Sequence, residues 1–334
     1  NVNMSFDRRE SVVSDLPVFF VRNKRELAAG INVRDWMHTN DEVNDMRRNR
    51  TDLAYEEVLN LAENDDFTHH KKSVGAITAH HIVIHRRNDQ IDKEPGEYIT
   101  VELTDLNDQD QRDEAAAVMT DCLKQVIFGG RSDVERVLVV GLGNQEITAD
   151  ALGPMAAREV IVTSHLFRLQ DPSVGQDMRE VAVIVPGVMG QTGMETAEFV
   201  QAVARQFQPD LVIAIDALGT RSLQRINRVI QISDTGIQPG GGVGNHRKAI
   251  NEALLGVPVI AVGVATVVSI EALIDQVLSA AGSDDYERIM QHIHYHESYQ
   301  MVLTPKEMDE EVRHLSEVIA RSLNQALHPR FDTM

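Results

Sequence analysis

The sequence has one cysteine, few aromatic residues and a deficit of positive charge. A single cysteine, Cys122, among 334 residues excludes an internal disulfide framework and a cysteine-based zinc cluster, and is typical of a reducing cytosol. Aromatic residues make up 4% of the chain, so few side chains could stack on nucleic-acid bases. The formal net charge of -19 opposes binding to nucleic acid and to anionic membranes. We therefore expect a cytoplasmic protein with no direct nucleic-acid partner and no membrane partner.

Secretion signals and uninterrupted hydrophobic runs are also missing. The opening NVNMSFDRRESVVSD is polar and mixed in charge, unlike a signal peptide. Residues 253–270 carry no charge, but Gly256, Pro258 and Gly263 interrupt them, which favours a loop, a buried strand and a second loop over a membrane span. Residues 1 to about 50 are rich in Asp, Arg and Asn with little periodicity, and we interpret them as an extension to the core.

The central part of the chain alternates apolar runs with helical patterns. The apolar runs are rich in Val, Ile and Ala, which indicates strands buried on both faces, as in a parallel sheet between helices. They occupy residues 134–143, 180–187, 210–217 and 257–264. Helical patterns occupy residues 154–166, 193–207, 269–281 and 304–327, the last beginning with a threonine cap and a proline. The sequence predicts an α/β fold with a mostly parallel central sheet flanked by helices.

Smaller elements surround this centre. Residues 53–64 and 115–128 have helical spacing, whereas residues 75–87 and 96–105 alternate as in an antiparallel or edge hairpin. Residues 225–234 alternate apolar and polar side chains, which suits an edge strand. We therefore expect a small β-hairpin region added to the main sheet.

Two aspartates stand where predicted strands run out: Asp150 in GLGNQEITADALGP and Asp216 in LVIAIDALGTR. Chemistry in open α/β sheets gathers at the carboxyl ends of strands. Two carboxylates that converge raise the pKa of one of them, so that one stays protonated while the other acts as a base. Asp150 and Asp216 are therefore the candidate catalytic acid–base pair. In the structural alternative, Asp150 caps the next helix and Asp216 ends its strand in a turn.

Glycine-rich turns follow several of the predicted strands. GLGN at 141–144 lacks the third glycine of a dinucleotide-binding fingerprint, because position 146 is Glu. PGVMGQTGMET (186–196) and PGGGVGNHRK (239–248) could line one rim and cradle an anion or a peptide backbone, although the second could equally be a surface loop. The candidate substrate-binding residues are Gly187, Gly190, Thr192, Gly240, Gly241, Gly242 and Asn245.

Other catalytic chemistries find less support in the sequence. His292 and His296 are one helical turn apart and could chelate a metal, but a solvated polar patch explains them as well. No GxSxG elbow occurs, and Ser222 lacks an evident base. We expect no metal and no cofactor.

Taken together, these motifs resemble those of the germination protease family of spore-forming bacteria, atypical aspartic endopeptidases that degrade small acid-soluble spore proteins. The resemblance covers roughly residues 50–327. It rests on GLGN and TADALGP around Asp150, HLFRLQ (165–170), PGVMGQTGMET, AIDAL around Asp216, QISDTGIQPGGGVGN (231–245), GVPVIAVGVATVV and VLTPKEMD (302–309). It implies that Asp150 and Asp216 are the catalytic pair, that the protein acts in the cytoplasm of the forespore and spore core, and that it forms a homotetramer.

The resemblance also implies a zymogen that removes its own N-terminal segment. Family cleavage sites have an acidic residue before the cut, then an apolar residue, Ala and, further on, Glu. Asp52, Leu53, Ala54 and Glu56 supply this pattern, so the implied cut lies between Asp52 and Leu53. Residues 1–52 would then be the propeptide, and residues 53–334 a single α/β peptidase domain with a C-terminal helix.

The mechanism implied is hydrolysis by a water molecule that one aspartate deprotonates while the other donates a proton. Two alternatives stay open at this stage. One is a metal-dependent peptidase similar to hydrogenase-maturing peptidases, whose α/β architecture the predicted fold resembles. The other is a non-enzymatic binding module whose glycine-rich rim holds an anionic ligand.

Overall fold

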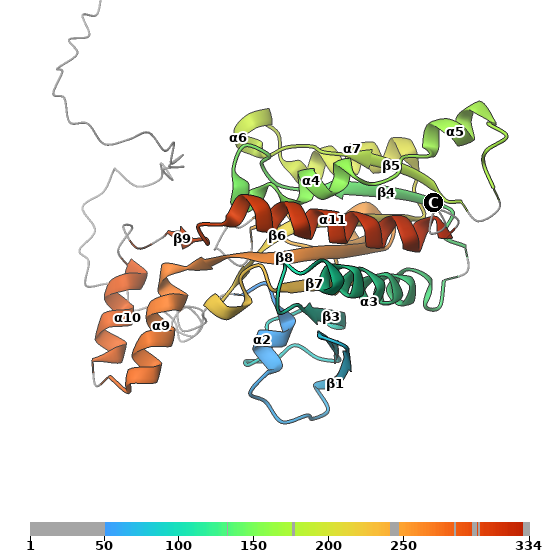
Figure 1. Cartoon of the computed structure of the whole chain (residues 1–334). Coiled ribbons are helices and arrows are strands. Elements are labelled where there is room, and N and C mark those ends of the chain that lie inside the picture. The colour runs from blue at the N-terminus through green and yellow to red at the C-terminus, as the bar shows by residue number, and fades with distance from the viewer. Residues whose placement is uncertain are drawn as a thin grey trace, which may run out of the picture. The chain divides into compact units, whose positions relative to one another are not determined.

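The computed structural model describes residues 51–131, 133–175, 178–240, 247–283, 285–295, 299 and 301–329 (Figure 1). All the described residues belong to one compact unit, Arg48–Met334. The extension expected over residues 1–50 lies outside them.

Nine strands within the described residues form one sheet in the order β1-β2-β3-β7-β8-β6-β4-β5, and β9 pairs with the end of β8. The strands are β1 (Phe67–Val74), β2 (Ile77–Ile84), β3 (Gly96–Glu102), β4 (Arg136–Gly141), β5 (Glu180–Ile184), β6 (Leu211–Thr220), β7 (Val229–Ser233), β8 (Val259–Ser269) and β9 (Val302–Leu303).

The sheet is mixed, so the expectation of a mostly parallel sheet is wrong. The strands β5, β4, β6 and β8 run parallel to one another, whereas the other five pairings are antiparallel. The expected hairpin corresponds to β2 and β3, but β3 pairs with β7 and joins the hairpin to the main sheet. As a result β7 is an interior strand between β3 and β8, although its alternating pattern predicted an edge.

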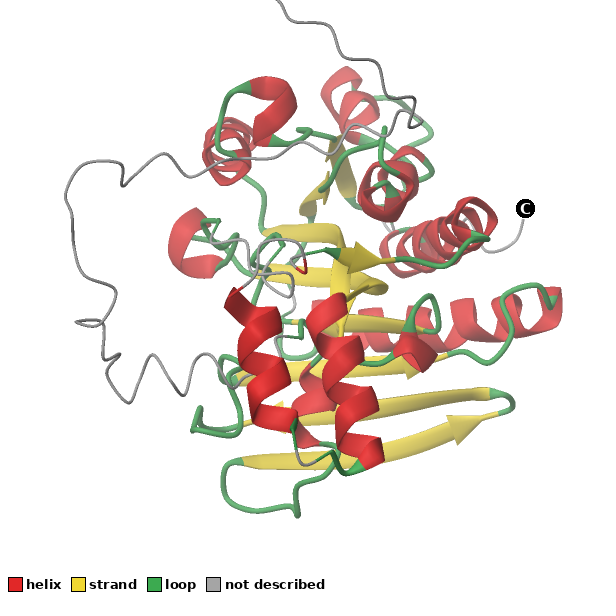
Figure 2. Ribbon diagram, turned by 90° about the vertical axis from the view of Figure 1, so that its left-hand side faces the viewer, coloured by secondary structure: helices red, strands yellow, loops and turns green. Residues whose placement is uncertain are grey.

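Helices cover both faces of this sheet (Figures 1 and 2). They are α2 (Ala54–Val58), α3 (Gln109–Phe128), α4 (Leu152–Arg158), α5 (Ser164–Leu169), α6 (Met189–Thr192), α7 (Thr196–Phe207), α8 (Glu252–Leu255), α9 (Ile270–Ala281), α10 (Tyr286–Tyr295) and α11 (Met308–Leu327), with 3₁₀ turns η1 (Thr148–Asp150) and η2 (Leu223–Arg225).

Successive side chains along each strand point to opposite faces of the sheet, so neighbouring residues of one strand pack against different helices. Along β6, Ile213 and Ile215 face a core built with α3, α4 and α11. Their neighbours Val212 and Ala214 face a second core with α7 and α8. Over β1 to β3 this second face is covered by α2. The second face therefore carries α7 at one side and α2 at the other, with the ends of β6, β8 and β7 between them.

Several predicted helices differ in their bounds. The pattern over 53–64 gives only the short helix α2, since the chain turns after Leu59 to start β1 at Phe67. The pattern over 154–166 divides into α4 and α5, whereas the pattern over 193–207 corresponds to α7, which begins at Thr196. Helix α11 begins at Met308 without a side-chain cap, so the cap expected at Thr304 is wrong. Among the described residues, no helix is both long enough and apolar enough to cross a membrane.

Close packing of α4 against the strand ends requires a glycine at position 153. A Cβ there would overlap the carbonyl oxygens of Leu142 and Ile215, and neither backbone can move without disturbing the sheet. We expect Gly153→Ala to lower the free energy of unfolding by about 1–3 kcal/mol. In the control Gly190→Ala, an added Cβ meets nothing within 4 Å, and the change should be small. Urea denaturation of both variants checks this, and equal effects would contradict it.

Candidate functional site

Asp216 lies within β6 and not in a turn after it, so the structural alternative for this residue is wrong. Alternation places its side chain on the α2 and α7 face, one residue beyond the level at which the neighbouring strand β4 stops. It is only 4% exposed, and one carboxylate oxygen accepts a hydrogen bond of 2.9 Å from the Ala217 N–H. Burial, and next the negative charge of Asp150, raise the pKa of Asp216 well above its usual range.

Asp150 ends the turn η1, which follows β4. Its Oδ2 accepts a hydrogen bond of 2.8 Å from the Asn144 N–H, and helix α4 begins beyond it with Ala151 at an N-cap that makes no side-chain hydrogen bond. Asp150 therefore does not cap the helix, which excludes the structural alternative. Burial raises its pKa to about 6, while the Asn144 N–H and the Arg247 cation oppose that shift.

The turn that carries Asp150 is fixed from several sides. Gly143 has a φ of +109°, and a Cβ on it would overlap the Asp150 carbonyl oxygen, so the close approach requires glycine. The Thr266 hydroxyl of β8 donates to the Ala149 carbonyl at 2.9 Å, and the Thr148 hydroxyl donates to Asp309 at 2.8 Å. The fold thus brings Asp150 close enough to Asp216 for its charge to raise the pKa of the Asp216 carboxyl.

The segment around the expected cleavage site lies beside Asp216. The Asp52 N–H donates to the Gly219 carbonyl at 3.0 Å, and the Gly219 N–H donates to the Asp52 carboxylate at 2.7 Å. The Asp52 charge contributes to the raised pKa of Asp216. The side chain of Leu53 is fully buried and packs with Leu218 of β6 and with β7 and β8.

Strand register shows where the Asp52–Leu53 bond crosses the sheet. Asp216 of β6 and Gln231 of β7 both pair with Gly263 of β8, so their side chains occupy one line across the same face. Two residues further along, Leu218, Val229 and Ala265 form the next such line, and these three pack against Leu53. Asp52 binds the Gln231 side chain of the first line and, on β6, Gly219 just beyond the second line, and Leu53 packs on the second line.

Glu56 is held in a buried polar cluster at the start of α2. Its carboxylate accepts hydrogen bonds from the Thr220 hydroxyl at 2.7 Å, the Arg221 N–H at 2.9 Å and the Arg225 guanidinium at 2.9 Å. The Thr51 hydroxyl donates to the same carboxylate at 2.5 Å. The structure thus fixes the acidic residue that lies four positions after Asp52.

The expected glycine-rich rim is only partly described. Gly187 has a φ of +73° and forms the turn after β5, and Gly190 lies in α6. The Thr192 hydroxyl bonds locally, donating to the Val188 carbonyl and accepting from the Met194 N–H, both at 3.2 Å. Gly240 has a φ of +69° in the turn before residue 241, whereas Gly241, Gly242 and Asn245 lie outside the described residues. Substrate binding by these seven residues stays a prediction.

Sequence reasoning missed three polar side chains of the site: Gln231, Arg225 and Gln191. The Gln191 amide donates to Asn144 Oδ1 at 2.7 Å, which links the turn after β5 to the residue that binds Asp150. Gln231 binds the backbone of the segment that holds the expected cleavage site. A sequence signal existed only for Gln231, which is a polar residue in a strand, but the strand was expected at an edge where polar residues are ordinary.

The positive charge of Arg247 acts on both aspartates and partly opposes the rise in the pKa of each. The described residues hold no group of three or more His, Cys, Asp or Glu side chains arranged to bind a metal ion. His292 packs edge-on against Tyr299, and His296 lies outside the described residues.

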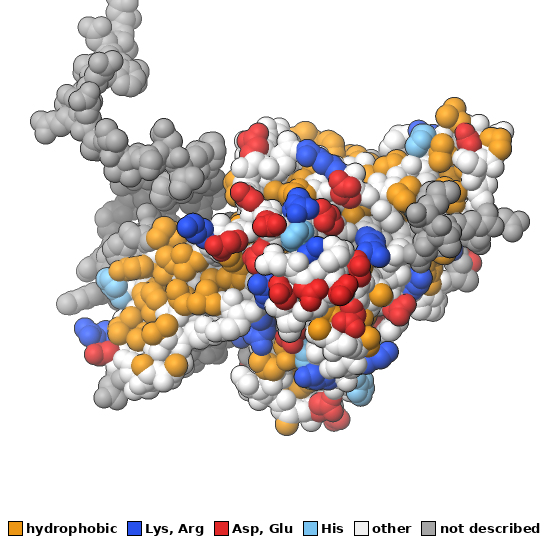
Figure 3. Space-filling model, in the orientation of Figure 1, with side chains coloured by type: hydrophobic (Ala, Val, Ile, Leu, Met, Phe, Trp, Pro, Cys, Tyr) orange, Lys and Arg blue, Asp and Glu red, His pale blue; other side chains and the backbone are white. Residues whose placement is uncertain are grey.

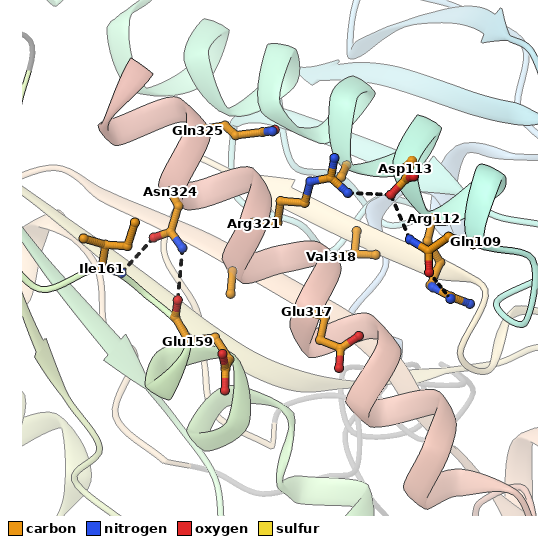
Figure 4. Close-up of a pocket in the computed structure, with 12 residues that line it drawn as sticks. Gln109, Arg112, Asp113, Glu159, Ile161, Glu317, Val318, Arg321, Asn324 and Gln325 are labelled. Carbon is orange, nitrogen blue, oxygen red and sulfur yellow. Dashed lines mark hydrogen bonds and ion pairs between the residues drawn. The ribbon is translucent and has the colours of Figure 1, made fainter. Parts of the chain in front are cut away.

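A pocket of about 550 Å³ lies elsewhere, between α3 and α11 (Figure 4). Arg321 pairs with Asp113 across it, and Asn324 contacts Glu159 and Ile161 at its other end. None of the candidate site residues lines this pocket, and we assign it no role in the chemistry of the aspartates.

The raised pKa of Asp150 predicts a pH-dependent stability difference. Unfolded aspartate ionises near pH 4 and folded Asp150 near pH 6, so the cost of ionising the native carboxyl is absent below pH 4 and complete above pH 6. Asp150→Asn should unfold with a free energy on the order of 3 kcal/mol above that of the wild type at pH 7.5, but not at pH 4.

Urea denaturation at the two pH values measures this difference. As a control, Asp171→Asn removes an exposed carboxylate whose pKa lies below its usual range because it accepts hydrogen bonds from Ser173, so this variant should gain nothing at pH 7.5. A stability difference for Asp150→Asn that is the same at both pH values would contradict the burial of its charge.

Comparison with known proteins gives consistent matches. A profile of the germination protease family matches residues 41–293. The germination protease of Oceanobacillus iheyensis is 36% identical, over 85% of this chain and 95% of the relative. Those of Clostridium perfringens and Clostridium tetani are 37% and 34% identical, over 72% and 85% of this chain and 80% and 96% of the relatives. The matched profile includes Thr51–Glu56 and both aspartates.

Proposed function

The chain belongs to the germination protease family and is, by that membership, a spore germination peptidase; we propose that it is an endopeptidase that hydrolyses small acid-soluble spore proteins. It would act in the cytoplasm of the forespore and spore core. Its sheet, with β5, β4, β6 and β8 parallel, would be related to that of hydrogenase-maturing peptidases.

The proposed mechanism is of an atypical aspartic type, with Asp150 and Asp216 as the acid–base pair. A water molecule attacks the carbonyl carbon of the peptide bond and loses a proton to the ionised carboxylate, while the protonated carboxyl supplies a proton to the leaving nitrogen. Burial raises the pKa of both carboxyl groups, so one member of the pair can hold a proton while the other is ionised. The two groups titrate as a coupled pair.

We further propose that the protein is made as a zymogen that cuts its own Asp52–Leu53 bond. The observation that carries this proposal is the position of that bond: Asp52 is hydrogen-bonded to Gly219, three residues after Asp216 on β6, and its charge reaches the Asp216 carboxyl. A peptide bond held on the strand that carries Asp216, close enough for the Asp52 charge to act on that carboxyl, favours intramolecular hydrolysis.

Intact-mass analysis of the full chain during incubation at pH 6 tests both proposals. We expect the wild type to lose the segment ending at Asp52 and to cut a peptide that contains a Glu-Ile bond, with or without chelator. Asp150→Asn and Asp216→Asn should each slow both reactions by at least about 10²-fold while keeping the native fold. The matched control Asp210→Asn, on the approach to β6, should react like the wild type if it folds.

Activity that survives either aspartate change would exclude the acid–base pair. Loss of wild-type activity in chelator would favour a metal-dependent peptidase. An intact wild-type chain together with an intact peptide would leave a fold without this activity.

The homotetramer is also a proposal, supported by an exposed apolar area near α9 and β9. Figure 3 shows this area beside the position of α9. It includes Val277, which is 59% exposed, and Met301, which is 55% exposed, together with Val302 and Leu303. Apolar areas of this kind mark contact surfaces, and closed homo-oligomers bury them between copies of one chain.

Sedimentation analysis of the wild type and of Val277→Glu checks the proposed assembly. We expect the wild type to sediment as a tetramer and Val277→Glu to dissociate at equal concentration, because the charge would be buried without a partner. The control Val74→Glu alters a valine on β1 that is 41% exposed and should leave the assembly intact. A wild type that sediments as a monomer would overturn the proposal.

A further inference from the structure

The buried amide of Gln231 has both of its hydrogen bonds on the segment that contains the Asp52–Leu53 bond. Its Nε2 donates to the Asp52 carbonyl oxygen at 2.9 Å, and its Oε1 accepts from the Ala54 N–H at 2.8 Å. The side chain is 7% exposed and lies on an interior strand. A buried amide without partners is costly, so this residue depends on the segment as much as the segment depends on it.

The orientation of the amide follows from its partners. Ala54 offers only an N–H donor and Asp52 only a carbonyl acceptor at these positions, so a single assignment of the amide oxygen and nitrogen satisfies both. The N–H of Gln231 therefore points at the oxygen of the bond expected to be cut. The amide oxygen holds the backbone on the other side of that bond.

Asp52 spans the sheet face from the strand of the aspartate to the strand of the glutamine. Its N–H and its carboxylate bind Gly219 of β6, while its carbonyl oxygen binds Gln231 of β7. Asp216 and Gln231 lie two strand spacings apart across Gly263, which corresponds to about 10 Å between their backbones. The Asp52 carbonyl oxygen is therefore bound by the Gln231 amide on β7, while the N–H and the side chain of Asp52 are bound to β6, the strand that carries Asp216.

Contacts on both sides of the bond keep the carbonyl in this position. Before it, the Lys93 ammonium donates to the Thr51 carbonyl at 2.6 Å. After it, Leu53 is fully buried and Glu56 is bound by Arg225. A pre-positioned donor of this kind needs no reorganisation when charge develops on the oxygen that it contacts.

We propose that Gln231 is an oxyanion-binding residue for the self-processing step, an inference that rests on the proposed function. Water gives one proton to the ionised member of the acid–base pair as it adds to the Asp52 carbonyl carbon, and the C=O electron pair moves to the oxygen that the Gln231 N–H contacts. The tetrahedral intermediate then collapses, the bond to the Leu53 nitrogen breaks, and that nitrogen takes a proton from the acid–base pair. The products are a new α-carboxylate at Asp52 and the ammonium form of the Leu53 amino group, with one water consumed and the acid–base pair returned to its starting protonation.

The rate of self-processing in the full chain, followed by intact mass, tests this role in two Gln231 variants. Gln231→Met preserves the length and removes both hydrogen bonds, so we expect processing to slow by about 10²–10³-fold, as for other single oxyanion donors. Gln231→Glu keeps the acceptor for Ala54 but can donate only when protonated. Its rate relative to the wild type should therefore rise as the pH falls from 7.5 to 5, a pH dependence that a change in side-chain volume alone would not produce.

The control Ser233→Ala changes another buried polar side chain on the same strand and face. This variant should process itself at a rate within about threefold of the wild type, which is a small difference compared with the loss of one oxyanion donor. If Gln231→Met does not fold, the pH dependence of Gln231→Glu decides. A wild type that processes, with Gln231→Met equally fast or with Gln231→Glu slowed equally at every pH, would overturn the role of Gln231 alone. A wild type that stays intact would overturn the proposed function, and this inference with it.

Discussion

The arrangement of the candidate site is governed by the burial of one carboxyl group, that of Asp216, against the central strands of the sheet. Asp216 lies on β6, where an apolar side chain would ordinarily face the helices, and burial keeps its pKa well above the usual range. An ionised carboxylate there would be unstable without strong compensation, so the surroundings must hold a proton or a cation nearby. The turn that presents Asp150, the Arg247 charge and the backbone N–H of Ala217 all act on this one group.

The mixed topology is what brings the expected cleavage site to that carboxyl. If the strand after β8 in the sheet were parallel, a crossover helix would cover the sheet face at that position. Here β7 and the hairpin strands run antiparallel, and their covering helix α2 is short. Thr51 to Leu53 lie on this face just before α2, with hydrogen bonds to β6 and β7.

Sequence patterns predicted the parts of this molecule that obey local rules. Continuous apolar runs revealed β4, β5, β6 and β8, and helical spacing revealed α3, α7, α9 and α11. The interior position of β7 was not predictable, because its alternating pattern describes the two faces and not the partners at its edges. Asp150 and Asp216 could be singled out because each stands near the carboxyl end of a predicted strand. Gln231 and Arg225 could not, since their partners lie about 170 to 180 residues away in the chain.

The segment Thr51–Glu56 is anchored unevenly about the Asp52–Leu53 bond. On its C-terminal side, Leu53 and Ala54 are fully buried and the chain continues directly into the fold. On its N-terminal side, Thr51 and Asp52 are held largely by hydrogen bonds to Lys93, Gly219 and Gln231. While the bond is intact, the chain keeps those groups at a high effective concentration. If the proposed cut were made, the same contacts would become an ordinary bimolecular equilibrium, and dilution alone would favour release of the N-terminal segment.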